Sequence, residues 1–505
     1  MHPKRTRVNA QLRGGRREID ILNRARNAPQ GFALRHSTAW MDHIFAMKSY
    51  WLENFGCRAT QADAAAVEAQ LAASGLTRSE EAARADVVVF NTCTVTAAAD
   101  AQAREAIRRV RRENPAARIL ATGCYAQRAP EELAALPGVA WVVGNSHQRQ
   151  IGELLAASQP AAAEHFVPLG ALAGPPAMPI ERAPKILSGD IFQADEVMVA
   201  PAAAGPGERT RPVLKIQDGC NNRCAYCVIP FVRGRSRSLP PERVREEVCG
   251  LVAAGAREIV LSGINLGTWG RDLAPRVGLG DLLARLVDET PVERIRLSSI
   301  EPMDVTLDLV DLVARQGGRI APHFHVPLQS GSDRMLAAMH RWYRAGHYEE
   351  RILRAAERLP GAAFGADVIC GFPGETQGDH ERTVALVERL PFSYLHVFSY
   401  SSRPGTRAAG MAESVPPAVI RERSRELRAI SERKAAAFRA AQSGSRQRVL
   451  TLERSGTRAD GQEWTGALTG NYLHVRVEGR WPRNAWLDVR ISAGGGELHG
   501  NILDA

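Results

Sequence analysis

The chain has 505 residues, of which 45% are hydrophobic and 24% are charged, and its formal net charge is +10. This length and balance are typical of a globular protein of about three domains, and they exclude a fibrous or largely disordered chain. The sequence has no run of 18 apolar residues and no apolar segment behind its basic start, which argues against a membrane span and a secretory signal.

Much of the positive charge lies at the start of the chain. Residues 1–46 contain nine Lys or Arg against three Asp or Glu, so the remaining chain carries only +4. Their composition predicts a disordered basic leader, and Met41 and Met47 are alternative starts before the first expected strand. Net charge is therefore weak support for an RNA partner. The basic stretches 104–112 and 233–238 are stronger support, with a solvated helix face as the alternative for the first.

Residues 47–154 alternate between short apolar runs and helix-forming stretches. The runs at 49–57, 85–93 and 117–124 each precede an expected helix, and a fourth run at 139–145 closes the unit. Continuous apolar runs of this length are typical of parallel strands that are buried on both faces. The pattern predicts an N-terminal parallel α/β domain.

Three further segments follow along the chain. The Ala-, Pro- and Gly-rich residues 155–211 are interpreted as a linker. Strand–helix alternation resumes over 212–440, where six apolar units predict a βα barrel, complete or partial, that ends in a long charged helix. Residues 441–505 show short alternating runs separated by glycines, as expected of a small antiparallel β-barrel.

Three of the eight cysteines, Cys220, Cys224 and Cys227, follow one of the expected barrel strands. Without a signal peptide, clustered cysteines are more often metal ligands or catalysts than disulfides. Three thiolates are one short of a closed structural zinc or iron–sulfur site, and the next cysteine, Cys249, is better explained as a small apolar side chain of a helix. The set therefore predicts a metal site with one open position.

A second set, Cys57, Cys93 and Cys124, is spread over the N-terminal domain. Each of these cysteines ends an expected strand just before a helix. Because the carboxyl ends of parallel strands share one edge of a sheet, the three thiols are expected to converge there. Three unrelated buried thiols are the alternative, but the repeated position favours a second site with three ligands.

The spacing Cys-x3-Cys-x2-Cys, with Tyr226 before the last cysteine, resembles the radical S-adenosylmethionine superfamily. This resemblance implies a 4Fe-4S cluster on Cys220, Cys224 and Cys227, whose open iron binds S-adenosylmethionine. The stretches 261–267 and 365–376 resemble the strand ends that contact the cofactor's methionine and adenine. Cys370, in the second stretch, is interpreted as structural. The resemblance implies cofactor contacts by Tyr226, Gly263, Asn265, Ser299, Gln329 and Gly371.

The stretches 91–100, 122–133 and 216–238 together are similar to the methylthiotransferases, a family of three-domain enzymes that insert sulfur into a C–H bond and methylate it. The resemblance extends from Lys48 to Ala505. It implies a second 4Fe-4S cluster on Cys57, Cys93 and Cys124, and S-adenosylmethionine as both methyl donor and radical source. The residues of these motifs are most similar to those of the branch that acts on N6-threonylcarbamoyladenosine at adenosine-37 of tRNA, next to the anticodon. One departure is GCRATQ at 56–61, where that branch often has Gly-Cys-Lys-Val-Asn-Gln.

The same resemblance implies partners and a location. Expected partners are tRNA, a reduced flavodoxin- or ferredoxin-type electron donor and a sulfur source, with no membrane, in the cytoplasm. The C-terminal barrel resembles the TRAM domain, an RNA-binding module. From Ala441 onward it has eight Arg against seven Asp or Glu, so RNA binding requires one concentrated basic face. Tyr472 and Trp464 are candidates for stacking on RNA, with the barrel core as the alternative.

Several other functions remain open from the sequence. Within the family, the substrate could be isopentenyladenosine in tRNA or an aspartate of a ribosomal protein. Outside it, the cysteines could belong to an iron–sulfur electron carrier or to a zinc-stapled RNA-binding protein.

Overall fold

The structure, a computed structural model, describes residues 47–158, 183–200, 210–457, 461–494 and 496–503. The leader predicted for 1–46 and most of the stretch interpreted as a linker lie outside these residues. Within the described part, no helix is both long enough and apolar enough to cross a lipid bilayer.

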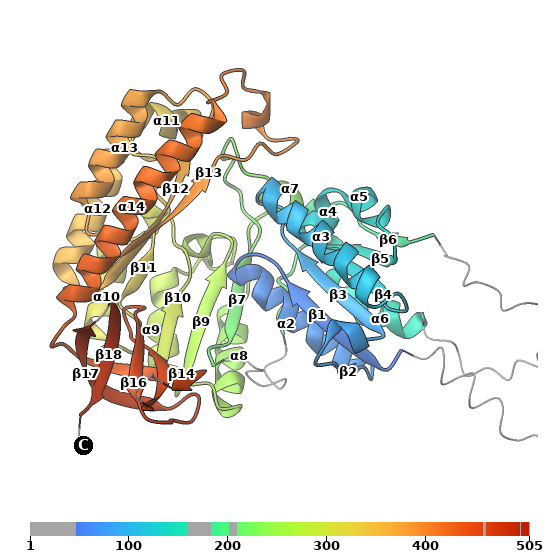
Figure 1. Cartoon of the computed structure of the whole chain (residues 1–505), viewed down its shortest axis with the longest axis horizontal. Coiled ribbons are helices and arrows are strands. Elements are labelled where there is room, and N and C mark those ends of the chain that lie inside the picture. The colour runs from blue at the N-terminus through green and yellow to red at the C-terminus, as the bar shows by residue number, and fades with distance from the viewer. Residues whose placement is uncertain (1–46, 159–182, 201–209, 458–460, 495, 504–505) are drawn as a thin grey trace, which may run out of the picture. The chain divides into compact units, whose positions relative to one another are not determined.

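The first part of the chain forms a six-stranded parallel sheet in the order β2-β1-β3-β4-β5-β6 (Figure 1). This sheet confirms the predicted N-terminal parallel α/β fold. A short strand from the stretch interpreted as a linker, β6, pairs with β5 and adds a strand that the sequence did not predict. The strands are β1 (Ser49–Asn54), β2 (Thr77–Arg78), β3 (Val87–Thr92), β4 (Arg118–Gly123), β5 (Val139–Gly144) and β6 (Lys185–Leu187).

Helices cover both faces of this sheet, which explains its continuous apolar runs. On one face, Ile107 of α3 and Tyr125 of α4 pack with Phe90 of β3. On the other face, Leu71 of α2 and Ile151 of α6 pack with alternate residues of the same strands. The helices are α2 (Arg58–Ala73), α3 (Ala97–Glu113), α4 (Cys124–Arg128), α5 (Pro130–Ala134) and α6 (Ile151–Ala157).

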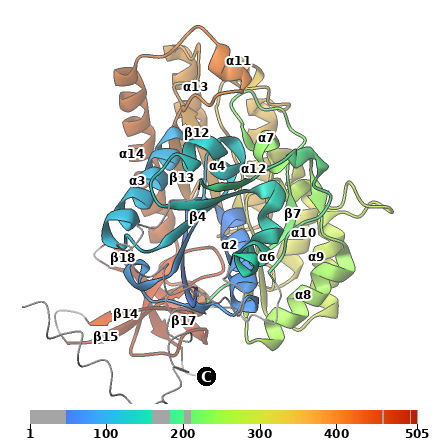
Figure 2. The same cartoon turned by 90° about the vertical axis from the view of Figure 1, so that its right-hand side faces the viewer.

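The central part contains six parallel strands, as the sequence predicted. Figure 1 labels all six, and Figure 2 shows β7, β12 and β13 from another side. Strands β7, β9 and β10 form one sheet, with β8 antiparallel at its edge, and β11, β12 and β13 form a second. Isolated bridges from Ile295 to Ile320 and from Ser299 to His325 connect β10 to the chain around β11, so the two sheets form a partial barrel. The strands are β7 (Val213–Asp218), β8 (Arg237–Ser238), β9 (Glu258–Gly263), β10 (Arg294–Leu297), β11 (His323–His325), β12 (Ala363–Cys370) and β13 (Tyr394–Ser399).

Amphipathic helices cover the outside of these strands and bury one extended apolar core. Phe324, Phe364 and Ala366 point toward this core, so the alternate residues of β11 and β12 point to the opposite, inner side. The helices are α7 (Ile229–Arg233), α8 (Pro241–Ala253), α9 (Leu279–Glu289), α10 (Leu307–Arg315), α11 (Asp333–Ala338), α12 (Ala345–Arg358), α13 (Gln377–Arg389) and α14 (Pro417–Ala441).

The C-terminal strands close into the predicted small barrel, in the order β14-β15-β16-β18-β17. Trp464 is 8% exposed and lies under the guanidinium groups of Arg454 and Arg476. This burial favours a place in the barrel core over stacking on RNA. The strands are β14 (Arg446–Thr457), β15 (Glu463–Leu468), β16 (His474–Glu478), β17 (Trp486–Gly494) and β18 (Glu497–Ile502).

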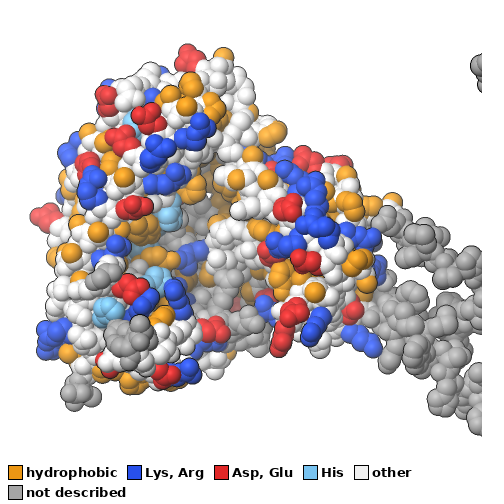
Figure 3. Space-filling model, in the orientation of Figure 1, with side chains coloured by type: hydrophobic (Ala, Val, Ile, Leu, Met, Phe, Trp, Pro, Cys, Tyr) orange, Lys and Arg blue, Asp and Glu red, His pale blue; other side chains and the backbone are white. Residues whose placement is uncertain are grey.

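The two basic stretches identified in the sequence differ in their exposure to solvent. On α3, Arg108, Arg109 and Arg112 are exposed, and Figure 3 shows Lys and Arg side chains gathered on the face over this helix. In the stretch 233–238, by contrast, Arg233 and Arg237 are buried. The expectation of an RNA-facing surface is wrong for these two residues, because acidic side chains from other elements neutralise them.

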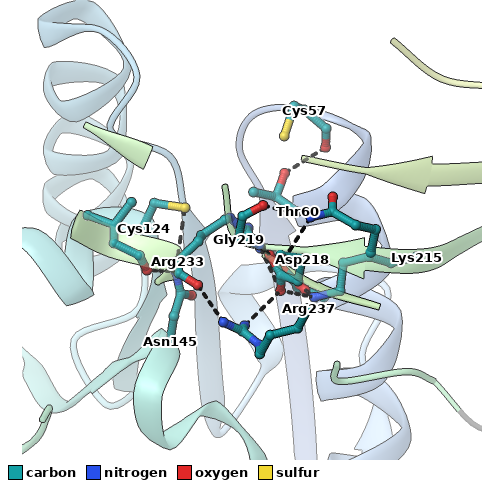
Figure 4. A network of polar contacts seen from close by, with 12 residues as sticks. Cys57, Thr60, Cys124, Asn145, Lys215, Asp218, Gly219, Arg233 and Arg237 are labelled. Atoms are coloured by element: carbon teal, nitrogen blue, oxygen red, sulfur yellow. Dashed lines mark hydrogen bonds and ion pairs between the residues drawn. The ribbon is translucent and has the colours of Figure 1, made fainter. Parts of the chain in front are cut away.

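A buried group of four charges joins α2 to the central part of the chain (Figure 4). Asp63 on α2 forms ion pairs with Lys215 on β7 and, at 2.6 Å, with Arg233 at the end of α7. Asp218 on β7 completes the group, 2.7 Å from Lys215 and 3.1 Å from Arg233. Arg237 lies 3.9 Å from Asp218 at the edge of this group and also donates to the carbonyl of Arg233. Each buried charge therefore has a partner of opposite sign, which is the condition under which buried charges are tolerated.

We expect Asp63→Asn to lower the free energy of unfolding by roughly 3–5 kcal/mol, because it leaves two buried cations facing one carboxylate. Urea unfolding of the iron-free protein, followed by tryptophan fluorescence, measures this loss. Asp311→Asn is the control, since Asp311 pairs with Arg358 at 2.6 Å on the surface and should contribute less than about 1 kcal/mol. Equal losses in the two variants would contradict the role of the buried group.

Candidate functional site

The first cysteine set lies at one edge of the N-terminal sheet. Cys57 follows β1 and occupies the N-cap position of α2, Cys93 directly follows β3, and Cys124 opens α4 directly after β4. Because β1, β3 and β4 are parallel neighbours, their carboxyl ends bring these three positions together. A Cβ atom built on Gly56 would lie 3.1 Å from the Cys93 sulfur, so the chain at Cys57 packs directly on Cys93.

Gly123 allows β4 to turn into α4 at the third cysteine. Its φ is +95°, a backbone conformation that side chains other than glycine rarely adopt. A Cβ atom here would lie 2.4 Å from the carbonyl oxygen of Thr92. The close approach of the two strand ends, which sets Cys124 beside Cys93, therefore requires glycine.

The electrostatics of this set reflect both burial and mutual proximity. Burial, together with the neighbouring sulfurs of Cys124 and Cys57, raises the pKa of Cys93 to about 12. Burial also raises the pKa of Cys124, while the guanidinium of Arg233 opposes this shift. The amide of Asn145 donates to the Cys124 sulfur at 3.6 Å. Cys93 and Cys124 are therefore neutral thiols until a metal displaces their protons.

The second cysteine set lies in the loop between β7 and α7. The Cys220 sulfur accepts from the backbone N–H of Asn222 at 3.4 Å and from the amide of Asn265 at 3.9 Å. The Cys224 sulfur accepts from the guanidinium of Arg341 at 3.2 Å. Burial raises the pKa of Cys227 to about 12, and the adjacent sulfur of Cys224 adds to the shift.

The two sets approach each other through α7, which follows Cys227. Val228 and Val232 form a small apolar cluster with Cys124 of the first set. The amide of Asn145, which donates to the Cys124 sulfur, also donates to the carbonyl of Val232 at 2.8 Å. The structure therefore brings elements of both predicted cysteine sites into contact.

The spacing of the thiols differs from that of a site for a single ion. Among the described residues, the three-ligand group with all ligand atoms within 4.8 Å is His325, Asp367 and His396, and neither cysteine set meets this limit. A zinc ion with bonds of about 2.3 Å to sulfur needs sulfurs about 3.8 Å apart. Neither cysteine set is therefore arranged for a single zinc ion. The donors that point at sulfur fit a negatively charged thiolate–iron group.

The residues expected to contact S-adenosylmethionine lie at or near the strand ends of the barrel. Asn265 is buried beside Cys220, and its Oδ1 atom has no hydrogen-bond partner in the described part of the chain. Gln329 has a φ of +66°, and Ser299 is exposed just after β10. Gly263 ends β9, and a Cβ atom there would lie 2.8 Å from the side chain of Gln217.

Two more of these residues lie in apolar surroundings. The Tyr226 ring packs edge-on against Phe372, with ring centroids 6.5 Å apart. Gly371 follows β12, and a Cβ atom there would lie 2.4 Å from Ile420 of α14, so this glycine permits close helix packing. The cysteines outside both sets differ from each other, since Cys370 is buried on β12 and Cys249 is half-buried on α8.

Sequence reasoning did not identify several charged residues next to the sulfurs. Arg341, which donates to Cys224, also forms an ion pair with Glu301. On the inner side of the barrel, Asp367 accepts hydrogen bonds from His325 at 2.9 Å and His396 at 3.2 Å. Burial raises the pKa of Asp367, but these hydrogen bonds outweigh burial and lower it to about 2. No local signal marks these pairs, because their members are between 29 and 42 residues apart.

Comparisons with known proteins match both cysteine-bearing parts of the chain. Residues 49–144 match the family described as Uncharacterized protein family UPF0004, and residues 214–387 match the Radical SAM superfamily. Among solved structures, that of a radical S-adenosylmethionine methyltransferase from Kitasatospora setae is similar, with a TM-score of 0.48 and 17% identity over 70% of this chain and 73% of that chain.

Curated relatives match over most of their length. Threonylcarbamoyladenosine tRNA methylthiotransferase MtaB of Aquifex aeolicus is 36% identical over 427 residues, which cover 85% of this chain and 96% of that protein. The protein of the same name from Bacillus subtilis is 35% identical over 86% of this chain and 91% of its own length. The tRNA-2-methylthio-N(6)-dimethylallyladenosine synthase of Sphingopyxis alaskensis is 33% identical over 89% of this chain and 96% of its own.

We expect Gly123→Ala to reduce the iron and sulfide bound after anaerobic reconstitution to about half of the wild-type amount, because the added Cβ displaces Cys124 from the first set. Colorimetric iron and sulfide analysis measures the loss. Gly75→Ala is the control, since Gly75 also has a positive φ, +81°, but has no atom within 4 Å of the added Cβ. Backbone strain alone would affect both variants alike, and equal iron contents would contradict the steric explanation.

Proposed function

Because this chain belongs to the radical S-adenosylmethionine methylthiotransferase family, we propose that it acts on tRNA and places a methylthio group on C2 of N6-threonylcarbamoyladenosine-37, next to the anticodon. The main support for this reaction type is the contact between the two three-cysteine sets, which is made by α7 and Cys124. The substrate is supported by the names of the relatives from Aquifex aeolicus and Bacillus subtilis, at 36% and 35% identity.

We assign the cofactors as follows. The Radical SAM match implies a 4Fe-4S cluster and S-adenosylmethionine, and Cys220, Cys224 and Cys227 would hold that cluster. We propose that the set Cys57, Cys93 and Cys124 holds a second 4Fe-4S cluster. When bound, these groups supply the electron, the carbon-centred radical, the sulfur and the methyl group of the reaction.

The chain's own residues hold these groups and exclude water. Arg341 donates a charged hydrogen bond to the Cys224 sulfur, which sets a positive group against the ligand that would carry negative charge on iron. Asn145 donates a neutral hydrogen bond to the Cys124 sulfur. Val228 and Val232 cover Cys124 with apolar side chains, and this contact keeps water away from one side of the first set.

The remaining parts of the proposal concern organisation and partners. We divide the chain into an N-terminal domain over 47–154, a central radical domain over 212–440 and an RNA-binding barrel over 441–505. A reduced flavodoxin- or ferredoxin-type donor would supply electrons, and a separate sulfur source would restore the sulfur. All eight cysteines are free thiols, which is consistent with the reducing environment of the cytoplasm.

A second substrate is supported by a specific observation. The relative named tRNA-2-methylthio-N(6)-dimethylallyladenosine synthase, from Sphingopyxis alaskensis, is 33% identical over 452 residues, close to the values for the first two relatives. Isopentenyladenosine at the same tRNA position is therefore the alternative. Because the chain belongs to this family, nothing supports the alternatives of an iron–sulfur electron carrier or of an RNA-binding protein stabilised by zinc.

We expect a strain that lacks the gene for this chain to lose 2-methylthio-N6-threonylcarbamoyladenosine from its tRNA and to accumulate the unmethylthiolated nucleoside. Liquid chromatography and mass spectrometry of digested tRNA detect both species. Expression of the full chain in the same strain should restore the product. Loss of 2-methylthio-isopentenyladenosine instead would show that the substrate assignment is wrong.

We expect Cys93→Ala to abolish methylthiolation, to below about 1% of wild type, while cleavage of S-adenosylmethionine continues. The first set would lose a ligand in this variant, whereas the site on Cys220, Cys224 and Cys227 stays complete. Cys227→Ala should abolish both activities, and Cys249→Ala, at a half-buried position of α8 outside both sets, should retain both. A normal product yield from Cys93→Ala would contradict the second cluster.

A further inference from the structure

A tyrosine of the C-terminal barrel reaches the inner side of the central strands. Tyr472 lies in the turn between β15 and β16 and has a φ of +67°, which is rare for a residue with a bulky side chain. Its ring stacks on His323 of β11, with centroids 4.5 Å apart. Its hydroxyl accepts a hydrogen bond of 2.9 Å from Arg58, the residue directly after Cys57. One side chain thus contacts all three parts of the chain.

Positive charge gathers around this ring. The guanidinium carbons of Arg58, Arg211 and Arg296 lie 5.8, 5.9 and 5.3 Å from the centroid of Tyr472. A fourth arginine, Arg294, lies beside Arg296 on β10 and shares the same acidic partner. That partner is Glu258, with which Arg211, Arg294 and Arg296 form ion pairs.

Two of the four arginines make several hydrogen bonds to protein acceptors. Arg296 donates to Glu258 at 2.7 Å and to the carbonyls of Gly470 and Thr469 at 2.9 and 3.0 Å. Arg294 donates to Glu258 at 3.4 Å and to the carbonyl of Arg448 at 2.8 Å. The single negative charge of Glu258 therefore lies against these two side chains, and their donors have acceptors.

The other two arginines, Arg58 and Arg211, have fewer hydrogen-bond acceptors around them. Arg58 has the neutral Tyr472 hydroxyl as its hydrogen-bond partner and forms no ion pair with any described residue. The buried Nη1 atom of Arg211 lies 3.5 Å from Glu258 in a loose ion pair and makes no hydrogen bond in the described part. Both side chains are partly open to solvent. Two cations with unused donors beside one ring are what a carboxylate or phosphate requires.

A column of rings leads from Tyr472 toward the strand ends. His323 is followed by Tyr394 at 6.1 Å, Tyr394 by His325 at 5.7 Å, and His325 by His396 at 5.0 Å. Phe398, at 6.3 Å from His396 and 44% exposed, continues the column toward the carboxyl end of β13. Figure 3 shows histidine side chains in a hollow on this face of the molecule. His396 and Phe398 are the exposed rings of the column, and a planar base can stack on them without loss of hydrogen bonding at its edges.

We propose that Arg58 and Arg211 form a subsite for the carboxylate of the substrate nucleoside, the threonyl carboxylate of N6-threonylcarbamoyladenosine, while the purine stacks on the column of rings. This inference rests on the proposed function and deepens it. Because Arg58 directly follows Cys57, the subsite lies on the same segment of the chain as a residue of the first cysteine set. An isopentenyl group has no charge and would leave both guanidinium groups without an anion.

Binding of anticodon stem–loop RNA to the reconstituted protein, without reductant, tests the subsite. One RNA carries N6-threonylcarbamoyladenosine and a second carries its methyl ester, so the two differ by one negative charge. Fluorescence anisotropy should show that the wild-type chain prefers the free carboxylate by roughly 10- to 100-fold, as expected for charged hydrogen bonds. In Arg58→Gln and in Arg211→Gln, this preference should fall below about threefold, while affinity for the ester stays unchanged.

A matched control and a conservative variant separate this role from a structural one. Arg104 donates to the Tyr125 hydroxyl at 2.7 Å and lies 5.8 Å from that ring, so Arg104→Gln removes a similar contact elsewhere and should keep the wild-type preference. Arg58→Lys keeps the charge and should retain part of the preference. Iron content and melting temperature of each variant verify that the chain is folded and loaded.

The outcomes distinguish the inference from the proposed function. If both glutamine variants weaken the two RNAs equally, the arginines bind backbone phosphate and the inference is overturned. It is also overturned if both variants keep the preference for the carboxylate. A deletion strain that loses a methylthio-isopentenyl product would instead reject the proposed substrate, whatever the variants show.

Discussion

The buried ion group of Asp63, Lys215, Arg233 and Asp218 is the constraint on which the site depends. Asp63 lies on α2, the helix that Cys57 precedes, whereas Lys215 and Asp218 lie on β7, just before Cys220. Arg233 ends α7, just after Cys227. The same four charges therefore tie the chain on both sides of the second cysteine set to the helix that carries the first. Separating any of these buried charges from its partner is costly, which opposes movement of α2 relative to β7 and α7.

Burial disfavours the charged thiolate form of the cysteines, and a bound metal would compensate for this penalty. The pKa values of Cys93 and Cys227 rise to about 12, so these side chains are neutral thiols in the protein without iron. Iron binds thiolate, so loading of the sites must release protons and should stabilise the surrounding fold. Arg233 and Arg341 lie close enough to favour the charged form of Cys124 and Cys227. These arginines prepare the sites for a negative cluster without supplying ligands.

Tyr472 joins the C-terminal barrel to the two other parts of the chain. Its ring is held by His323 from the central strands and by Arg58 from the N-terminal domain. The turn that carries it also supplies the carbonyls of Thr469 and Gly470 to Arg296. The barrel is thereby joined to the inner side of the central strands, and a change in that turn would be felt at the residue beside Cys57.

The sequence by itself determined the three-part fold and both cysteine sets. Apolar runs, turn residues and the spacing of Cys220, Cys224 and Cys227 are local patterns, and the convergence of Cys57, Cys93 and Cys124 follows from the geometry of parallel strands. Only the tertiary structure decided that Arg233 and Arg237 are buried, that Arg341 contacts a cysteine, and that Tyr472 meets Arg58 across 414 residues. The physical reason is that a charge in a sequence has no fixed partner. Whether it faces water, an acid or a ring depends on how distant segments pack.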